Sequence, residues 1–166
     1  MAKVHFFYST MNAGKSTALL QSAHNYHETG NETILFIPRE DAERNSGLIK
    51  SRIGLSASAI VIDSKLKIFE YVQKEVEKRK IDAILVDEAQ FLKKHHVLQM
   101  CKICDELEIP VMCYGIRTDF RGELFEGSGS LLALADNLIE LKTVCNECSK
   151  KATMVVRLDE NGKVVT

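Results

Sequence analysis

The sequence predicts an α/β fold, a parallel sheet with helices on both faces, and three observations support this prediction. Short, continuously apolar segments alternate with longer amphipathic ones along most of the chain. Only 2 prolines and 9 glycines interrupt the 166 residues, so most of the chain is expected in regular structure. Unbroken apolar strands are typical of sheets buried on both faces, and helices between such strands indicate βαβ units.

The expected elements follow one another in a regular order. Strands are expected at 4–8, 33–37, 59–62, 83–88 and 111–115, and helices at 15–29, 65–80, 93–107 and 131–136. Gly30 ends the first helix, and Phe69, Val72 and Val76 mark the buried face of the second. Ligands of such sheets bind at the carboxyl ends of the strands, so the residues just after each strand are the first candidates for a site.

The last part of the chain has a different character. There, "CNEC" is followed by β-rich runs on either side of Asn161–Gly162, a dipeptide typical of hairpin turns. We therefore expect a main domain at 1–142 and a small, zinc-ribbon-like β appendage at 143–166. The chain stops partway through this appendage, so we expect the sequence to be truncated.

The composition excludes several classes of partner and location. The net charge of −1 provides no overall field that would attract nucleic acid or an anionic membrane. The apolar runs are too short to span a bilayer, and the N-terminus lacks the pattern of a secretory signal. The 5 cysteines, an odd number, argue against a disulfide framework and for a reducing compartment. We expect a cytoplasmic protein without nucleic-acid or membrane partners.

The stretch "STMNAGKS", Ser9 to Ser16, fits all but the first position of the phosphate-loop pattern G-x-x-x-x-G-K-[ST]. Backbone N–H groups near Gly14 and the start of the following helix would cradle phosphate oxygens. The Lys15 ammonium would reach the terminal phosphates, and the Ser16 hydroxyl would bind Mg²⁺. Ser9 replaces a glycine that mainly permits a tight turn. The alternative is a plain strand–turn–helix junction in which "GKST" occurs by chance.

The apolar strand "ILVDE" ends in two acids, Asp87 and Glu88. In phosphate-loop proteins an aspartate at such a strand end holds Mg²⁺, usually through water. The alternative is a strand end with two solvated carboxylates. Together with the upstream loop, the pair predicts a P-loop NTPase-like domain that binds ATP with Mg²⁺. Glu88 is then the candidate general base.

The segment "YGIRTDFRGELFEGS" also follows a strand end and is expected near the same site. It interleaves Phe120 and Phe125 with Arg117 and Arg121. Aromatic rings stack on bases, and arginines bind phosphates. The alternative is a surface loop whose phenylalanines fill the core.

Four motifs in order, "MNAGKST", "VDEAQF", "YGIRTDFRGELF" and "LKTVCNEC", together resemble the thymidine kinase family, the type with a phosphate loop and a zinc-binding segment. The resemblance runs from about Lys3 to the end of the chain, and Ser9 is similar to bacterial members. It implies transfer of the γ-phosphoryl of ATP to the 5′-hydroxyl of thymidine in nucleotide salvage, with deoxyuridine as a second candidate acceptor. It also implies a homotetramer inhibited by thymidine triphosphate. The competing hypothesis is a non-catalytic phosphate-loop module that binds ATP to switch shape.

The resemblance also assigns residues. Those it implies at the nucleotide are Ser9, Thr10, Met11, Asn12, Ala13, Gly14, Lys15, Ser16, Asp87, Glu88, Ala89 and Gln90. Ser16 and Asp87 would serve Mg²⁺, and Glu88 would be the catalytic proton acceptor. A flat base and its methyl group require apolar walls, and those implied are Met11, Phe91, Ile116, Phe120 and Phe125.

The cysteines fall into two C-x-x-C pairs and one single residue. Cys145 and Cys148 enclose polar "NE", as a zinc knuckle would, but structural Zn²⁺ needs four ligands and no Cys or His follows Cys148. The family's second ligand pair comes later, so the other two ligands are absent from this chain. Cys101 and Cys104 lie on an expected helix, where core packing is the main interpretation and a metal site the alternative. The polar stretch 44–52 is expected to be a loop near the phosphates.

Overall fold

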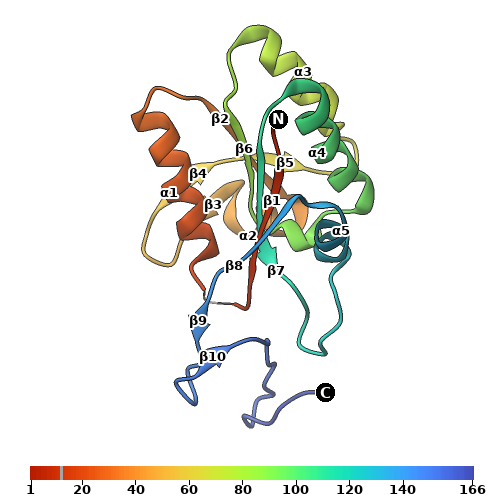
Figure 1. Ribbon diagram of the computed structural model, residues 1–166. Helices are drawn as coiled ribbons and strands as arrows, with labels where there is room; N and C mark the ends of the chain where they lie inside the picture. The colour runs from red at the N-terminus through yellow and green to blue at the C-terminus, as the bar shows by residue number, and fades with distance from the viewer. Residues whose placement is uncertain (12) are drawn as a thin grey trace.

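The computed structural model describes residues 1–11 and 13–166, and its centre is a six-stranded sheet with the order β5-β2-β6-β7-β1-β8 (Figure 1). Every neighbouring pair in this sheet is parallel, which confirms the predicted α/β class. In chain order, the strands are β1 (Val4–Ser9), β2 (Thr33–Pro38), β5 (Ile60–Ile62), β6 (Ala83–Val86), β7 (Val111–Ile116) and β8 (Asn137–Glu140).

The buried strands explain the continuous apolar runs of the sequence. All residues of β2, "TILFIP", and of β6, "AILV", are buried, because both strands lie inside the sheet and both of its faces are covered. The edge strands β5 and β8 are only partly buried.

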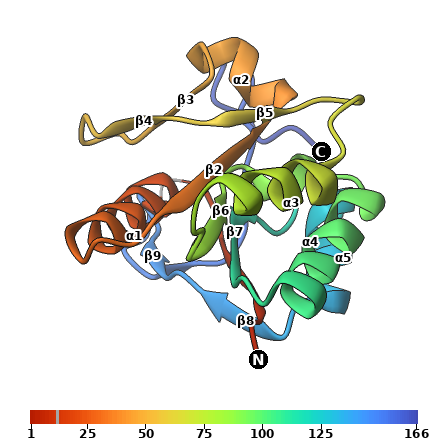
Figure 2. The same ribbon diagram turned by 90° about the horizontal axis from the view of Figure 1, so that it is seen from above.

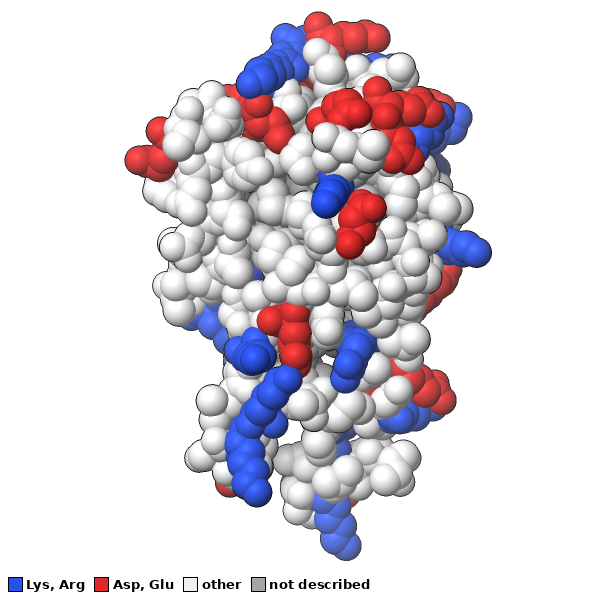
Figure 3. Space-filling view, in the orientation of Figure 1, with Lys and Arg blue, Asp and Glu red and all other residues white. Residues whose placement is uncertain are grey.

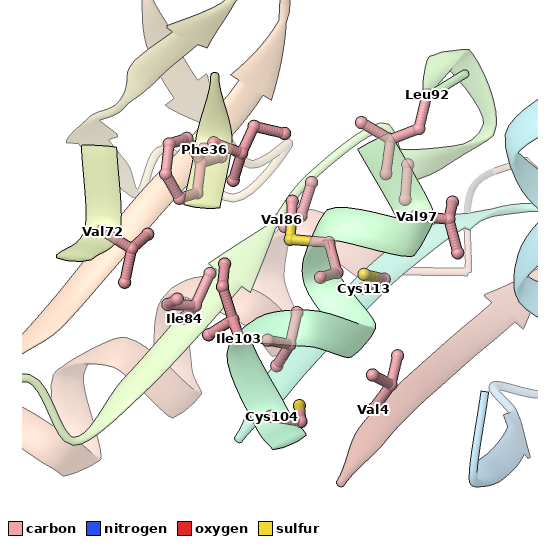
Figure 4. Packing of buried hydrophobic residues seen from close by; sticks show 14 of the residues in the cluster. Val4, Phe36, Val72, Ile84, Val86, Leu92, Val97, Ile103, Cys104 and Cys113 are labelled. Carbon is pink, nitrogen blue, oxygen red and sulfur yellow. The ribbon is translucent and has the colours of Figure 1, made fainter. Parts of the chain in front are cut away.

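Helices cover both faces (Figure 2). On one face lie α3 (Ile68–Lys78), α4 (Lys94–Leu107) and α5 (Glu126–Leu134). On the other face lies α1 (Lys15–Glu28). Its buried residues form one apolar cluster with Ile49, which belongs to a short strand that packs beside this helix. Figure 4 shows the first cluster, where side chains of α4 meet those of β6 and β7. Cys104 is buried in this cluster and Cys101 packs against it half-buried, so the core interpretation of this pair is confirmed.

Three sequence expectations need correction. The region after β2 contains a helix, α2 (Arg39–Asn45), and an antiparallel hairpin, β3 (Leu48–Lys50) and β4 (Ser56–Ser58), where the sequence suggested only a loop. Val76, expected on the buried face of α3, is 37% exposed because it lies near the end of the helix, beyond its packed part. The last helix, α5, was expected at 131–136. It begins well before this range, at Glu126, and ends close to the expected end, at Leu134.

The C-terminal segment lies beyond the carboxyl edge of the main sheet (Figure 1). It contains the antiparallel pair β9 (Thr143–Val144) and β10 (Lys151–Ala152), and one bridge, Leu158 to Val164, that closes a turn at Asn161–Gly162. In the view of Figure 3, charged side chains of both signs lie over this segment and over the main body. Among the described residues, no helix is both long and apolar enough to cross a membrane.

Candidate functional site

The phosphate loop joins the end of β1 to the start of α1 at the carboxyl edge of the sheet. Gly14 caps α1 in the left-handed conformation, with φ 73° and ψ 29°, which a glycine adopts without strain. The first N–H groups of α1 have no partner within the helix and are therefore available to an anion. Ser9 and Thr10 are buried, Ala13 is half-buried and Met11 is 53% exposed. Asn12, expected in this loop, lies outside the described residues.

Lys15 is buried and is held by its own loop. Its ammonium donates to Ser9 Oγ at 3.2 Å and to the Thr10 carbonyl oxygen at 2.9 Å. Burial lowers the pKa of Lys15, while the charges of Glu88 and Asp87 act in the opposite direction. The serine that replaces the usual first glycine therefore accepts a hydrogen bond from Lys15.

The side chains of Ser16 and Asp87 bring two oxygen atoms together at the end of β6. The Ser16 hydroxyl donates to Asp87 Oδ2 at 2.7 Å. Burial raises the pKa of Asp87 to about 6, helped by the charges of Glu88 and Asp41 and opposed by the hydrogen bonds from Ser16 and from the Glu88 N–H. A carboxylate deprived of water and touching a hydroxyl is a suitable pair of hard ligands for Mg²⁺. The residues present thus fit the cation that the family implies.

Glu88 stands at a strained backbone position. It adopts φ 49° and ψ 41°, the left-handed region that residues with a side chain occupy rarely and that clusters at functional sites. Its half-exposed carboxylate accepts a hydrogen bond from the side-chain amide of Gln90. The 3₁₀ turn Ala89–Phe91 follows directly, so the conformation of Glu88 aims the chain from β6 into this turn.

The 3₁₀ turn Ala89–Phe91 packs closely against the backbone of β7 and of α5. Gln90 is buried, and its Oε1 accepts a hydrogen bond from the Ile116 N–H at 3.3 Å. A Cβ at Gly115 would lie 2.8 Å from Gln90 Oε1, and one at Gly127 would lie 2.8 Å from the Leu92 carbonyl oxygen. Neither glycine was assigned from the sequence, although a glycine inside an expected strand is a signal of close backbone approach.

The expected base-pocket residues are only partly brought together. The rings of Phe91 and Phe125 meet edge to face, with centroids 5.8 Å apart. Ile116 is tied to the same region, because Ser128 Oγ donates to its carbonyl oxygen at 2.5 Å. Phe120 lies between the guanidinium groups of two arginines in the β7–α5 loop and the C-terminal segment, and Met11 lies on the phosphate loop.

Two charged residues near the site were not assigned from the sequence. Arg52, at the tip of the β3–β4 hairpin, is close enough to Lys15 to lower its pKa, and Asp41 of α2 adds to the raised pKa of Asp87. Arg52 belongs to the stretch 44–52, whose expected position near the phosphates stays a prediction. Neither segment has an apolar periodicity that would have placed these side chains.

Cys145 and Cys148 form a tight knuckle after β9. The pKa of the Cys145 thiol is lowered by the backbone N–H groups of Glu147 and Cys148 and by the Cys148 side chain, which favours the thiolate that zinc requires. No three His, Cys, Asp or Glu side chains gather as a metal site within 1–11 and 13–166. The pair fits half of a four-ligand zinc site.

The chain is similar to known proteins over nearly its whole length. The family model described as "Thymidine kinase" matches residues 2–166. The thymidine kinase of Zymomonas mobilis is 52% identical over 165 residues, which are 99% of this chain and 85% of that protein. Thymidine kinases of Yersinia pestis and Salmonella typhi are 52% and 50% identical, over 99% and 98% of this chain and 84% and 79% of theirs.

Proposed function

Because this chain belongs to the thymidine kinase family and is a kinase of thymidine, we propose that its phosphate loop and the Asp87–Glu88 pair form the catalytic centre. In this proposal the γ-phosphoryl of ATP passes to the 5′-hydroxyl of thymidine. The observation that carries the assignment is the contact between Ser16 and Asp87, which joins the loop to the strand end that presents Glu88. The family match argues against the competing hypothesis of a non-catalytic ATP-binding module.

Each residue has a role that follows from its position. Lys15 exchanges Ser9 Oγ and the Thr10 carbonyl for phosphate oxygens, and the N–H groups at the start of α1 bind the same anion. Ser16 and Asp87 would hold Mg²⁺, which would supply positive charge that offsets the charge of the phosphoryl group. Glu88 accepts the proton of the 5′-hydroxyl while that oxygen bonds to phosphorus and the bond to the ADP oxygen breaks. Gln90 keeps the Glu88 carboxylate in place.

The acceptor base is bound by apolar walls in this proposal. The Phe91–Phe125 pair and Ile116 form one side, and Phe120 and Met11 complete the pocket. Thymine and uracil differ by one methyl group, which is worth about 1–3 kcal/mol in an apolar pocket. Deoxyuridine is therefore a weaker second acceptor.

The remaining proposals rest on the family more than on the geometry. Cys145 and Cys148 supply two of the four ligands of a structural Zn²⁺, supported by the donors that stabilise the Cys145 thiolate. A homotetramer, feedback inhibition by thymidine triphosphate and a cytoplasmic location follow from the resemblance of the four motifs.

The proposed catalytic centre is tested by Mg²⁺-dependent phosphorylation of a nucleoside panel. Thymidine should be converted, deoxyuridine less efficiently, and deoxycytidine and deoxyadenosine not at all. Glu88→Gln should lower kcat about 10²–10⁴-fold while ATP binding measured by calorimetry stays close to that of the parent chain. Glu106→Gln, on the far end of α4, is the matched control. Full activity of Glu88→Gln would show that another group accepts the proton.

A further inference from the structure

The C-terminal segment contacts the loop between β7 and α5, which carries Phe120. Thr118 Oγ1 donates to Met154 Sδ at 4.0 Å, and Met154 Cε lies 3.3 Å from where a Cβ of Gly122 would stand. The Arg157 guanidinium lies 5.6 Å from the centroid of the Phe120 ring. Figure 1 shows this loop and the C-terminal segment descending together below the carboxyl edge of the sheet.

The same C-terminal segment also reaches the end of β1. A small cavity is lined by Tyr8, Ser9 and Thr10 at the start of the phosphate loop, and by Thr153 and Val155 from the C-terminal segment. Residues 153–157 therefore lie against the start of the phosphate loop and against the β7–α5 loop, which carries Phe120.

Phe120 is bound by two cations. Arg121 lies 5.3 Å from its ring centroid and Arg157 lies 5.6 Å away, both within the roughly 6 Å range of cation–π attraction. Neither guanidinium has a carboxylate within ion-pair distance in the part of the chain that the structure describes. Arg121 is the next residue of the same loop and moves with it. Arg157 comes from another segment and can fix the ring relative to the rest of the molecule.

The tip of the β7–α5 loop is closed by hydrogen bonds within the loop, whereas the two ends of the loop contact the main body. The Asp119 carboxylate accepts the N–H groups of Arg121 and Glu123, at 2.8 and 3.1 Å. At its start, the Arg117 N–H donates to the Ser9 carbonyl oxygen at 3.4 Å. The contacts that reach the loop tip from Met154 and Arg157 both come from the C-terminal segment.

We propose that Arg157 is a positioning residue for the acceptor nucleoside, which it serves by holding the Phe120 ring at the base pocket. This inference rests on the proposed role of Phe120 as a wall of that pocket. It makes the affinity for thymidine, but not for ATP, depend on the C-terminal β segment.

The experiment measures kcat and the two KM values in a double-mutant cycle. Arg157→Met keeps the aliphatic stem and removes the charge, and should raise the KM for thymidine about two- to fivefold with kcat and the KM for ATP unchanged. Arg157→Lys, which keeps a cation, should restore part of the loss. Lys163→Met removes a cation from the same segment without touching Phe120, and should change nothing.

Phe120→Leu tests the base-pocket role of Phe120 separately from the positioning role of Arg157. On its own it should raise the KM for thymidine, and Arg157→Met should add nothing in the Phe120→Leu background. An unchanged KM in Phe120→Leu would refute the base-pocket assignment. A raised KM there, combined with no effect of Arg157→Met or with an equal effect in both backgrounds, would refute the role of Arg157 alone. Thermal unfolding of each variant identifies any loss of activity that comes from a loss of folded protein.

Discussion

Ser16 and Asp87 are in direct contact: the hydroxyl at the start of α1 donates to the carboxylate at the end of β6 across 2.7 Å. Asp87 is buried, and its pKa of about 6 shows how unfavourable an uncompensated charge is there. A divalent cation between these two oxygens and the phosphates would compensate that charge. We therefore propose that this contact marks the place where the protein binds a divalent cation.

Ser16→Ala removes one oxygen of this site. We expect the Mg²⁺ concentration for half-maximal activity to rise at least as much as after loss of a supporting partner of a metal, about 10–100-fold. Ser22→Ala, a hydroxyl deletion farther along α1, should leave the Mg²⁺ requirement unchanged. Kinase activity titrated with Mg²⁺ at fixed ATP measures both. Equal Mg²⁺ requirements for Ser16→Ala and the parent would show that the hydroxyl does not bind the cation.

Ser9 and Lys15 should respond very differently to substitution. Ser9→Ala removes a neutral hydrogen-bond acceptor for Lys15, a change of about 1 kcal/mol, so the KM for ATP should shift by about fivefold or less. Lys15→Ala removes the charge that meets the phosphates, and we expect loss of nearly all turnover together with weaker ATP binding. Calorimetric titration with ATP and steady-state kinetics provide the comparison. Undiminished turnover in Lys15→Ala would contradict the phosphate-loop assignment.

Gly127 and Gly129 provide a matched pair within α5. A Cβ at position 127 would collide with the carbonyl oxygens of Ala89, Gln90 and Leu92, whereas at 129 its nearest neighbour would be a Leu124 methyl at 3.8 Å. Gly127→Ala should lower the free energy of unfolding by about 1–3 kcal/mol and reduce activity by displacing the turn. Gly129→Ala should be neutral or stabilise the helix by up to about 1 kcal/mol. Urea unfolding of the two variants measures this difference. Equal stabilities of Gly127→Ala and Gly129→Ala would show that the 3₁₀ turn can move away from a Cβ at little energetic cost.

His96 makes the stability of the protein sensitive to acid. It is 7% exposed, its Nδ1 accepts the Lys93 N–H at 3.0 Å, and its Nε2 has no hydrogen-bond partner among the described residues. Burial lowers its pKa to about 4; the charges of His95 and Lys93 also lower the pKa, and those of Glu40 and Glu126 oppose them. Because the unfolded chain binds the proton more readily, stability should fall as pH decreases from about 6.5 towards 4.

His96→Gln should remove this part of the pH dependence. Gln can still accept the Lys93 N–H and carries no charge at any pH. Between pH 7.5 and 4.5 we expect the parent to lose about 1–2 kcal/mol more unfolding free energy than the variant. His24→Gln, at an exposed position of α1 on the other face of the sheet, is the control and should behave like the parent. Parallel pH profiles for the parent and His96→Gln would exclude His96 as the titrating group.

The sequence predicted the features that depend on short contiguous patterns. The apolar runs of β1, β2, β6 and β7 and the "GKS" at the start of α1 are local, because burial on both faces and phosphate binding each require particular neighbouring residues. The β3–β4 hairpin was missed because its three-residue strands are too short to show a period. The early start of α5 was missed because "EGSGS" has poor helix propensity, and packing against the turn fixes it instead.

The complete set of expected base-pocket residues was assigned through the family resemblance, and it stays a prediction. Phe91 and Phe125 meet because Gly127 lets α5 approach the turn, and no local pattern links residues so far apart. The contact between Arg157 and Phe120 is likewise a consequence of chain topology. Such relationships depend on which segments the fold places side by side.

The position of β1 inside the sheet has a consequence for the order of folding. This strand precedes every other strand of the sheet in the sequence, yet its two neighbours are β7 (Val111–Ile116) and β8 (Asn137–Glu140). A ribosome must therefore release the chain as far as β7 before β1 has a partner in the sheet, and the apolar residues of β1 remain unpaired until then. Pairings between such distant segments slow folding and leave nascent chains open to aggregation, so this protein should depend on chaperones during synthesis more than its size suggests.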